Sequence, residues 1–494
     1  MPESAIAIRP VAYEIRLRNT RTRIPFRYGP TVLVACPIAH LFVTVEGPGG
    51  ARVEGLAGDA LAPGWYDKRP NRTYRNDIDE LSETMREAGR TLMALSETGP
   101  RSVFELWRDL VPSQLEWARK NNCTDMTGNF GASMFERALI DATGKLTGKT
   151  FHALVNENML GIDPGAVKPY LKGWQAREAL APEPLKKVFL RHTVGGLDPL
   201  TAADVPAAEI VKDGLPHTLE DYLQAQRLRY FKLKLRCDEA FDIDRLRTIA
   251  ALLDKYVPAN EPYHVTLDGN EVYYEPEKLT QLLAKLSSGG VSKRFYDSIL
   301  FVEQPFPRQK ALEDSLRDEI SKISKYKSLI VDESTENLES VPRALELGYA
   351  GFAIKSCKGP IKALLEKGAM VRHPKRPANP IVSGEDMTNQ PVVPLFEDLT
   401  VMATLGVEHV ERNGHHFFRG MSVHSDAERA AVLAQQPNLY ARKGPDLVAL
   451  RTETGALDVS GLVVRPGLGV LANEVDRSAI LPLDEWKYES LGLK

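Results

Sequence analysis

The sequence predicts an α/β protein in which a small N-terminal α+β domain precedes a closed barrel of parallel strands. Residues 6–46 show the β-branched alternation of strands, and residues 75–120 have the apolar period of helices. Strands and helices in separate blocks are typical of an α+β domain. From about residue 185, short apolar strands alternate with helical segments, which indicates parallel βα units.

The spacing of these strands predicts their number. A βα unit of an eight-stranded barrel averages about 30 residues. Counting from the strand in KKVFLRHTVGG, the next seven strands are expected to end at Lys234, Asp268, Glu303, Asp332, Lys355, Ser383 and Glu411. Lys234 then lies on the second strand and Glu411 on the eighth, so the chain has enough units to close a barrel.

Bulk properties restrict the class of protein. A chain of 494 residues exceeds the usual size of a single core, which favours two domains. The net charge of −3 provides no global field for nucleic acid or an anionic membrane, so neither is an expected partner. Four dispersed cysteines and an N-terminus without signal-peptide features predict a cytoplasmic protein without disulfides.

Ionisable side chains stand at the ends of five consecutive expected strands. They are Lys232 with Lys234, then Asp268, Glu303, Asp332 and Lys355. Catalytic groups of such barrels lie at the C-terminal ends of the strands. One such charge would be unremarkable as a cap or loop residue, but five in register predict an active site.

The three carboxylates are candidate metal ligands. Asp268, Glu303 and Asp332 would repel one another strongly at one point unless a cation lay between them. Hard oxygen ligands without His or Cys suit Mg²⁺, with Mn²⁺ as an alternative. Asn270 and Glu333 are expected beside the ligands, and Glu333 could replace Asp332 as the third ligand.

The lysines are candidate catalytic residues. Alternation in YFKLKLR places Lys232 and Lys234 inside the barrel and Phe231 and Leu233 outside it. A metal ion, a second ammonium and a dry interior would each lower a lysine pKa toward neutrality. We expect Lys232 to hold a substrate carboxylate, Lys234 to remove the adjacent α-proton and Lys355 to face the opposite side of the substrate.

The motifs KLK, LDGN, VEQPF, VDES and IKSCKG together resemble the enolase superfamily, in particular its muconate-lactonising branch. FERALIDATGKLTGKTF is similar to the family's helix that leads from the capping domain into the barrel, and RPGLGV resembles the C-terminal segment that returns to cover the capping domain. The resemblance implies a modified (β/α)7β TIM-like barrel over residues 151–440, a capping domain over 1–150 and a returning segment over 441–494. It also implies a homo-oligomer that uses Mg²⁺ to abstract the α-proton of a small-molecule carboxylate.

The sequence departs from the mandelate-racemase pattern. The seventh strand, IVSGEDMTN, has no His, and the sixth ends in Lys355, which argues against a His–Asp pair. The leading hypothesis is a racemase or epimerase that uses lysines on both faces of the substrate. A cycloisomerase, lyase or dehydratase with one lysine base is the alternative, and a catalytically idle binding module is a remote one.

Other polar residues have open roles. His415 and His416 follow the eighth strand, and Glu411 and Asp386 end the eighth and seventh, where substrate contact and a solvated rim are both consistent with the pattern. Loops of the capping domain that would close over the substrate contribute Arg27, Tyr28 and Trp65 as specificity candidates. GKLTGKT follows a helix, which predicts a helix C-cap and not a phosphate-binding loop.

Overall fold

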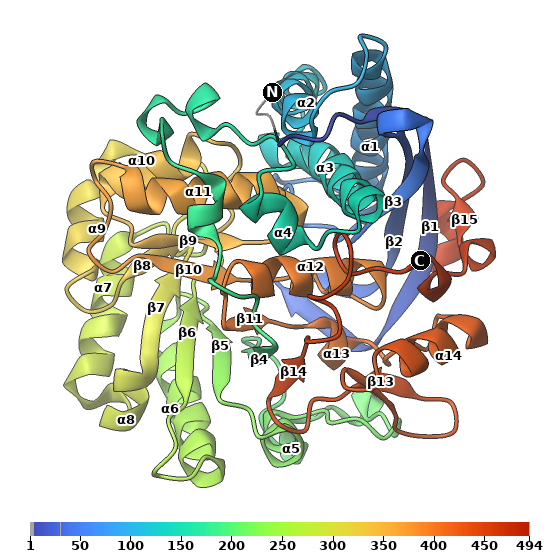
Figure 1. Ribbon diagram of the computed structural model, residues 1–494. Helices are drawn as coiled ribbons and strands as arrows, with labels where there is room; N and C mark the ends of the chain where they lie inside the picture. The colour runs from blue at the N-terminus through green and yellow to red at the C-terminus, as the bar shows by residue number, and fades with distance from the viewer. Residues whose placement is uncertain (1–3, 30, 494) are drawn as a thin grey trace.

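A four-stranded antiparallel sheet forms the N-terminal part of the chain in the computed structural model, which describes residues 4–29 and 31–493. Its strands are β1 (Arg9–Tyr28), β2 (Thr31–Glu46), β3 (Arg52–Ala60) and the short β15 (Leu481–Pro482). They lie in the order β15-β1-β2-β3, so the C-terminal segment pairs with the first strand of the chain (Figure 1). The sequence predicted the first two strands and missed β3.

Three helices cover this sheet: α1 (Tyr74–Ser96), α2 (Val103–Lys120) and α3 (Asp125–Thr147). Each begins at a Ser or Thr whose side chain accepts a hydrogen bond from the first helical turn, as in common N-caps. α3 is buried along most of its length. Its C-cap is Gly148, with a φ of 68° in the left-handed region, so the C-cap predicted for GKLTGKT is confirmed.

Eight parallel strands form the closed barrel. They are β4 (Lys187–Val194), β5 (Tyr230–Lys234), β6 (His264–Asp268), β7 (Ile299–Glu303), β8 (Leu329–Val331), β9 (Gly351–Ile354), β10 (Ile381–Gly384) and β11 (His409–Glu411). β11 pairs with β4 and closes the ring. Every expected strand end lies within one residue of the observed one, because the hydrophobic run and the charge that follows it mark the same boundary.

Helical connections join successive strands of the barrel, one or more in each of the seven intervals. They contain α5 (Leu219–Gln226), α6 (Glu239–Tyr256), α7 (Pro276–Lys285) with α8 (Lys293–Ser298), α9 (Arg317–Ile323), α10 (Ser340–Leu347), α11 (Pro360–Arg372) and α12 (Val393–Thr404). α4 (Phe151–Asn156) precedes the barrel, and α13 (Gly414–Phe417) and α14 (Asp426–Gln435) follow it. A TIM-like barrel with a capping domain, as the sequence predicts, is therefore the fold.

The C-terminal segment returns to both parts of the molecule. β12 (Tyr440–Arg442) pairs with β13 (Val448–Leu450), and β14 (Ala456–Asp458) runs antiparallel to β4. The remainder reaches the capping sheet through β15, beside the blue strands of Figure 1. Domain bounds at residues 150 and 440 stay a prediction.

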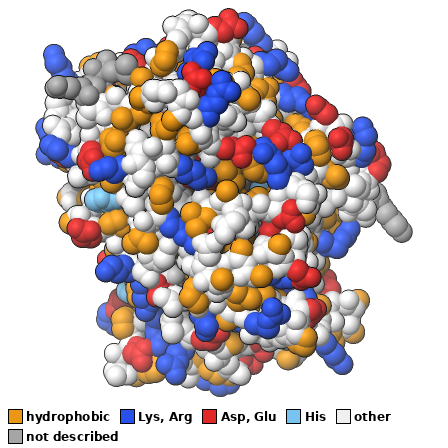
Figure 2. Space-filling model, turned by 45° about the vertical axis from the view of Figure 1, so that its right-hand side comes forward, with side chains coloured by type: hydrophobic (Ala, Val, Ile, Leu, Met, Phe, Trp, Pro, Cys, Tyr) orange, Lys and Arg blue, Asp and Glu red, His pale blue; other side chains and the backbone are white. Residues whose placement is uncertain are grey.

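The surface carries mixed charge. On the face drawn in Figure 2, acidic and basic side chains are interspersed instead of gathering into one region. Among the described residues, no helix is both long and apolar enough to cross a membrane.

Candidate active site

The alternation of β5 directs its lysines into the barrel. Phe231 and Leu233 are buried in the hydrophobic core, while Lys232 and Lys234 contact carboxylates of neighbouring strands. The predicted orientation of both lysines is confirmed. A surface strand would have placed the same ammonium groups in water.

Lys232 is at the centre of a carboxylate ring. Its ammonium nitrogen lies 2.7 Å from Glu385 Oε2, 2.8 Å from Glu303 Oε1 and 2.9 Å from Glu411 Oε2. Asp268 Oδ2 is 3.1 Å away. Only 2% of the Lys232 side chain is exposed, so these pairs are shielded from solvent screening.

Lys234 and Lys355 lie on opposite sides of the barrel, because three strands lie between β5 and β9 in either direction around the ring. Lys234 contacts Asp268 at 2.5 Å, and its side chain is 15% exposed. Lys355, just after β9, is buried between Asp332 Oδ2 at 2.5 Å and Glu385 Oε2 at 2.8 Å. The two lysines therefore differ in how firmly they are held.

Within the network of ion pairs around Lys232 and Lys355, the carboxylates are matched by the chain's own cations. Acidic and basic side chains are equal in number: Asp268, Glu303, Asp332, Glu385 and Glu411 against Arg191, Lys232, Lys234, Lys355 and Lys358. The repulsion that led us to expect a metal is thus offset by the chain's own cations. A metal ion would have to compete with ammonium groups for carboxylate oxygens.

Without a metal ion the pKa values of the lysines shift upward, whereas the expected lowering assumed a metal ion beside them. Burial alone would lower the pKa of Lys232, but Asp268 and its neighbouring carboxylates raise it well above the ordinary value. The pKa values of Lys234 and Lys355 are also raised, since the negative charges of Asp268 and Asp332, respectively, outweigh the desolvation of the two ammonium groups. The prediction omitted the carboxylates that pair with each lysine.

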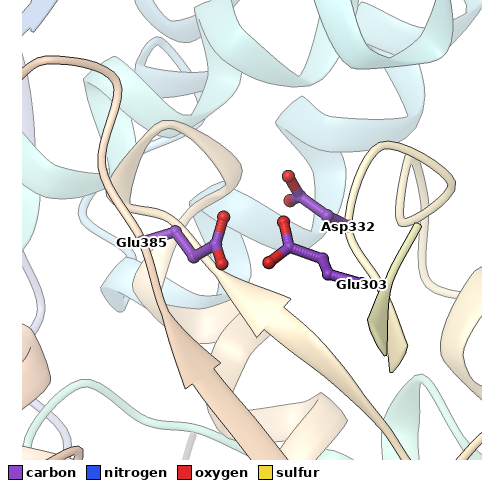
Figure 3. Close-up of side chains that lie close together, drawn as sticks. All are labelled: Glu303, Asp332 and Glu385. Carbon is purple, nitrogen blue, oxygen red and sulfur yellow. The ribbon is translucent and has the colours of Figure 1, made fainter. Parts of the chain in front are cut away.

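A possible metal-binding cluster is formed by Glu303, Asp332 and Glu385. Figure 3 shows their carboxylates pointing toward one another from the ends of β7, β8 and β10. One oxygen from each lies within 4.8 Å of the others. This spacing and the all-oxygen donor set fit Mg²⁺. Asp268 ends β6 beside the cluster, where Lys232 and Lys234 contact it.

The second acidic residue after β8 faces elsewhere. Glu333 Oε1 accepts hydrogen bonds from Asn270 at 2.7 Å and from Lys68 of the capping domain at 3.1 Å. Asp332 is thus the residue of this pair that reaches the cluster. Asn270 and Glu333 contact each other and link the barrel rim to the cap.

Glu385 is the site residue that sequence reasoning missed. It follows β10 directly, contacts Lys232 and Lys355, and accepts a 2.8 Å hydrogen bond from the buried Arg191. The signal was present: Glu385 is the first charged residue after the apolar strand, as at the other strand ends. Its neighbour Asp386, whose role the sequence leaves open, pairs with Arg412 at 3.3 Å and lines the same pocket as Lys232.

The capping domain closes the site. α3 contacts the loop after β9, where Ser133 Oγ donates to the Cys357 carbonyl at 2.8 Å. Trp65 and Tyr28 line a pocket of about 50 Å³ with Lys232, Lys234 and Lys355, and the Lys355 ammonium lies 5.1 Å from the centre of the Trp65 ring.

Two further candidates lie outside this pocket. Arg27 pairs with Glu209 at 2.7 Å in a wider space above the pocket. His416 stacks on His192 and Phe417, and burial lowers its pKa well below the ordinary value. Packing therefore accounts for His416, and neither it nor His415 lines the pocket.

Comparisons with known proteins place the fold. No protein-family model and no curated protein matches the chain. Solved structures of mandelate racemase/muconate lactonizing enzyme-like and enolase proteins do share its architecture over most of its length. The resemblance inferred from the motifs is confirmed at the level of the fold.

Three solved structures illustrate this likeness. Muconate lactonizing enzyme from Pseudomonas fluorescens, complexed with muconolactone, has a TM-score of 0.58 at 16% identity and covers 95% of this chain and 98% of its own. An enolase from Bradyrhizobium, complexed with magnesium and mandelic acid, has a TM-score of 0.57 at 15% identity and covers 96% of this chain and 97% of its own. Dipeptide epimerase from Enterococcus faecalis, complexed with Mg and a dipeptide, has a TM-score of 0.57 at 12% identity and covers 93% of this chain and 99% of its own.

Proposed function

We propose that the chain is a Mg²⁺-dependent enzyme that abstracts the proton α to a carboxylate, most simply as a racemase or epimerase. The observation that carries this proposal is the placement of Lys234 and Lys355 on opposite sides of one pocket beside a carboxylate cluster. Solved structures with the same fold include an enolase with magnesium and mandelic acid and a dipeptide epimerase.

Glu303 and Asp332 would hold the metal together with one further carboxylate. There are two candidates for this third ligand. The sequence motifs favour Asp268, whereas in the structure Glu385 lies closest to the other two carboxylates as the third member of the cluster. When bound, Mg²⁺ would neutralise part of the carboxylate charge and polarise the substrate's carboxylate. Lys232, next to the same carboxylates, would fix one substrate oxygen.

The lysines would carry out the proton transfer. Asp268 raises the pKa of Lys234, so Lys234 would first have to lose a proton to solvent, which a cation that draws charge from Asp268 would favour. The neutral Nζ of Lys234 would then accept the α-proton, and the electrons of the broken C–H bond would delocalise into the carboxylate as an enediolate. The ammonium of Lys355 then donates a proton to the opposite face of the α-carbon, which inverts the centre. Exchange of protons with solvent restores the original charge of both lysines.

A one-base reaction, cycloisomerisation or elimination, is the second candidate. The observation that favours it is the unequal pairing of the lysines: Lys355 is held by two carboxylates and Lys234 by one. A doubly paired ammonium is better suited to stabilise an enediolate as a fixed cation than to exchange protons.

The test is α-proton exchange. Panels of α-hydroxy, N-acyl-amino and dipeptide acids would be incubated with the protein in deuterated water, with Mg²⁺ or with EDTA. Magnesium-dependent gain of deuterium at the α-carbon is expected for at least one class. No exchange in any class, or exchange that is indifferent to EDTA, would rule out the proposed chemistry.

A further inference from the structure

A second cavity, of about 190 Å³, lies outside the candidate active site. Its walls come from α5, α12 and α13, from the β12–β13 hairpin and from the loops after β4 and β10. Figure 1 draws α5, α13 and β13 near one another in the lower part of the view. Among the described residues, none before residue 150 lines this cavity, and it shares no lining residue with the pocket around Lys232. The capping domain therefore has no part in it.

Two loops form the wall between this cavity and the active-site pocket. Thr388 and Asn413 line the pocket, while the residues that follow them, Asn389 and Gly414, line the cavity. The loops pack directly on each other, because a Cβ on Gly414 would lie 2.3 Å from the Asn389 carbonyl oxygen. The cavity and the pocket are thus neighbours on either side of one wall.

Buried polar groups without partners gather on this cavity. Within residues 4–29 and 31–493, no hydrogen bond reaches the Tyr440 hydroxyl, the side-chain oxygens of Gln226 and Asn389, or either ring nitrogen of His415. All four residues line the cavity, and no more than 5% of Tyr440, Gln226 or Asn389 is exposed. Because buried polar atoms of folded proteins are nearly always hydrogen-bonded, five such atoms on one cavity indicate a ligand that pairs with them.

These groups require both donors and acceptors from a ligand. The Tyr440 hydroxyl can donate a hydrogen bond, and the oxygens of Gln226 and Asn389 accept. Burial lowers the pKa of His415 to about 3, so the neutral ring offers one donor and one acceptor. Hydroxyl groups meet both needs, since a single hydroxyl donates one hydrogen bond and also accepts.

The cavity offers no uncompensated charge. In the part of the chain that the structure describes, Lys443 and Glu453 are its only charged lining residues, and they pair with each other at 2.9 Å. A charged ligand would lose its hydration here without gaining an opposite charge. Other parts of the wall are the buried apolar side chains Leu395, Ala449 and Leu450. The cavity favours a neutral molecule with C–H groups on one side.

The volume of the cavity limits the size of the ligand. It equals the liquid volume of about six water molecules and is smaller than the usual site of a drug-sized ligand. A short carbon chain with several hydroxyl groups fits this space.

We infer that this cavity binds a small neutral polyol, whose hydroxyl groups pair with the five unpartnered atoms while its carbon chain contacts the apolar wall. The inference is independent of the proposed function, because none of the residues that line the cavity would hold the metal ion or transfer a proton.

The test compares polyols with diols of the same chain length. Glycerol, erythritol and xylitol would each be paired with the diol that keeps only the two terminal hydroxyl groups. Titrations followed by saturation-transfer NMR would measure the affinity of the full chain for each compound. At one chain length or more, the polyol should bind at least about fivefold more tightly than the diol, as expected for one added hydrogen bond.

Two variants remove unpartnered groups with little change of side-chain volume. Tyr440→Phe and Gln226→Met should each weaken the binding of the polyol about fivefold. Tyr349→Phe is the matched control: it removes another buried hydroxyl, which donates to the Ala311 carbonyl at 2.9 Å, and should leave polyol binding unchanged. Urea unfolding should show the opposite pattern, with a lower midpoint for Tyr349→Phe and a wild-type midpoint for Tyr440→Phe, whose hydroxyl has no partner to lose.

Three results would overturn the inference. If no polyol is preferred at any chain length, the cavity holds water only. If the affinity for the polyol is unchanged in Tyr440→Phe or in Gln226→Met, the polyol binds elsewhere. If malonamide, a neutral amide of similar size, binds more tightly than glycerol and loses affinity in Tyr440→Phe, the ligand is an amide and not a polyol.

Discussion

The ammonium nitrogen of Lys232 lies 2.7 Å from Oε2 of Glu385, inside the barrel and shielded from solvent. Glu385 also contacts Lys355, so one carboxylate joins the lysine that would hold the substrate to a lysine that would transfer a proton. Both lysines are kept charged by such contacts. For the proposed proton transfer, carboxylate charge must therefore be drawn away from the lysine that acts as the base.

Lys232 should be needed for the stability of the metal-free protein. Lys232→Met leaves four buried carboxylates without their shared cation, and unfolding in urea with EDTA should show a loss of roughly 3–5 kcal/mol. Lys234→Met, whose ammonium contacts one carboxylate and is partly exposed, should lose less. Added Mg²⁺ should recover part of the loss in Lys232→Met. Equal stability of Lys232→Met and wild type in EDTA would contradict the charge balance described here.

The third metal ligand can be identified by paired variants. Glu303→Gln should abolish Mg²⁺ binding in calorimetry while the fold is retained, since Glu303 belongs to both candidate sets. Asp268→Asn and Glu385→Gln each remove one alternative ligand without a large change of shape. The variant with the greater loss of Mg²⁺ affinity identifies the ligand, and unchanged binding in Glu303→Gln would refute the site.

The cap should depend on one buried arginine for its attachment. Arg137 of α3 is fully buried and contacts Asp59 of β3 at 3.0 Å and Glu397 of α12 at 2.9 Å. Arg137→Met would leave two buried carboxylates unpaired across the cap–barrel contact, at a cost of roughly 3–5 kcal/mol. Arg119→Met, which removes an exposed pair with Asp125, should cost less than about 1 kcal/mol in the same urea titration. Similar losses in both variants would show that Arg137 has no special role.

The barrel could be predicted from the sequence because its strands are short apolar runs that end at a charge. Lys234, Asp268 and Glu303 end their strands where the hydrophobic pattern stops. The strand β3 was missed because RVEGLAGDA contains two glycines and little regular alternation.

The partners of each charge could not be predicted in the same way. Lys232 is surrounded by carboxylates from four other strand ends, and their distances depend on how the barrel closes. Sequence reasoning therefore identified Lys232 as buried but did not anticipate that these carboxylates raise its pKa. Glu385 was passed over because the seventh strand was taken to end at Ser383, one residue before the observed end.

Proton transfer on both faces of the substrate would be visible in the α-proton exchange of each enantiomer. If Lys234 and Lys355 flank the α-carbon, each enantiomer should gain deuterium at the α-position as it forms the other. Lys234→Arg should stop exchange from one enantiomer and leave some from the other, because arginine keeps the charge but cannot act as a base near neutral pH. Lys355→Arg should do the reverse, with the exchange of each enantiomer followed by NMR. If Lys355→Arg leaves exchange from both enantiomers intact, Lys355 is not a base, and the one-base cycloisomerase or lyase replaces the racemase, with Lys355 acting as a fixed cation beside the enediolate.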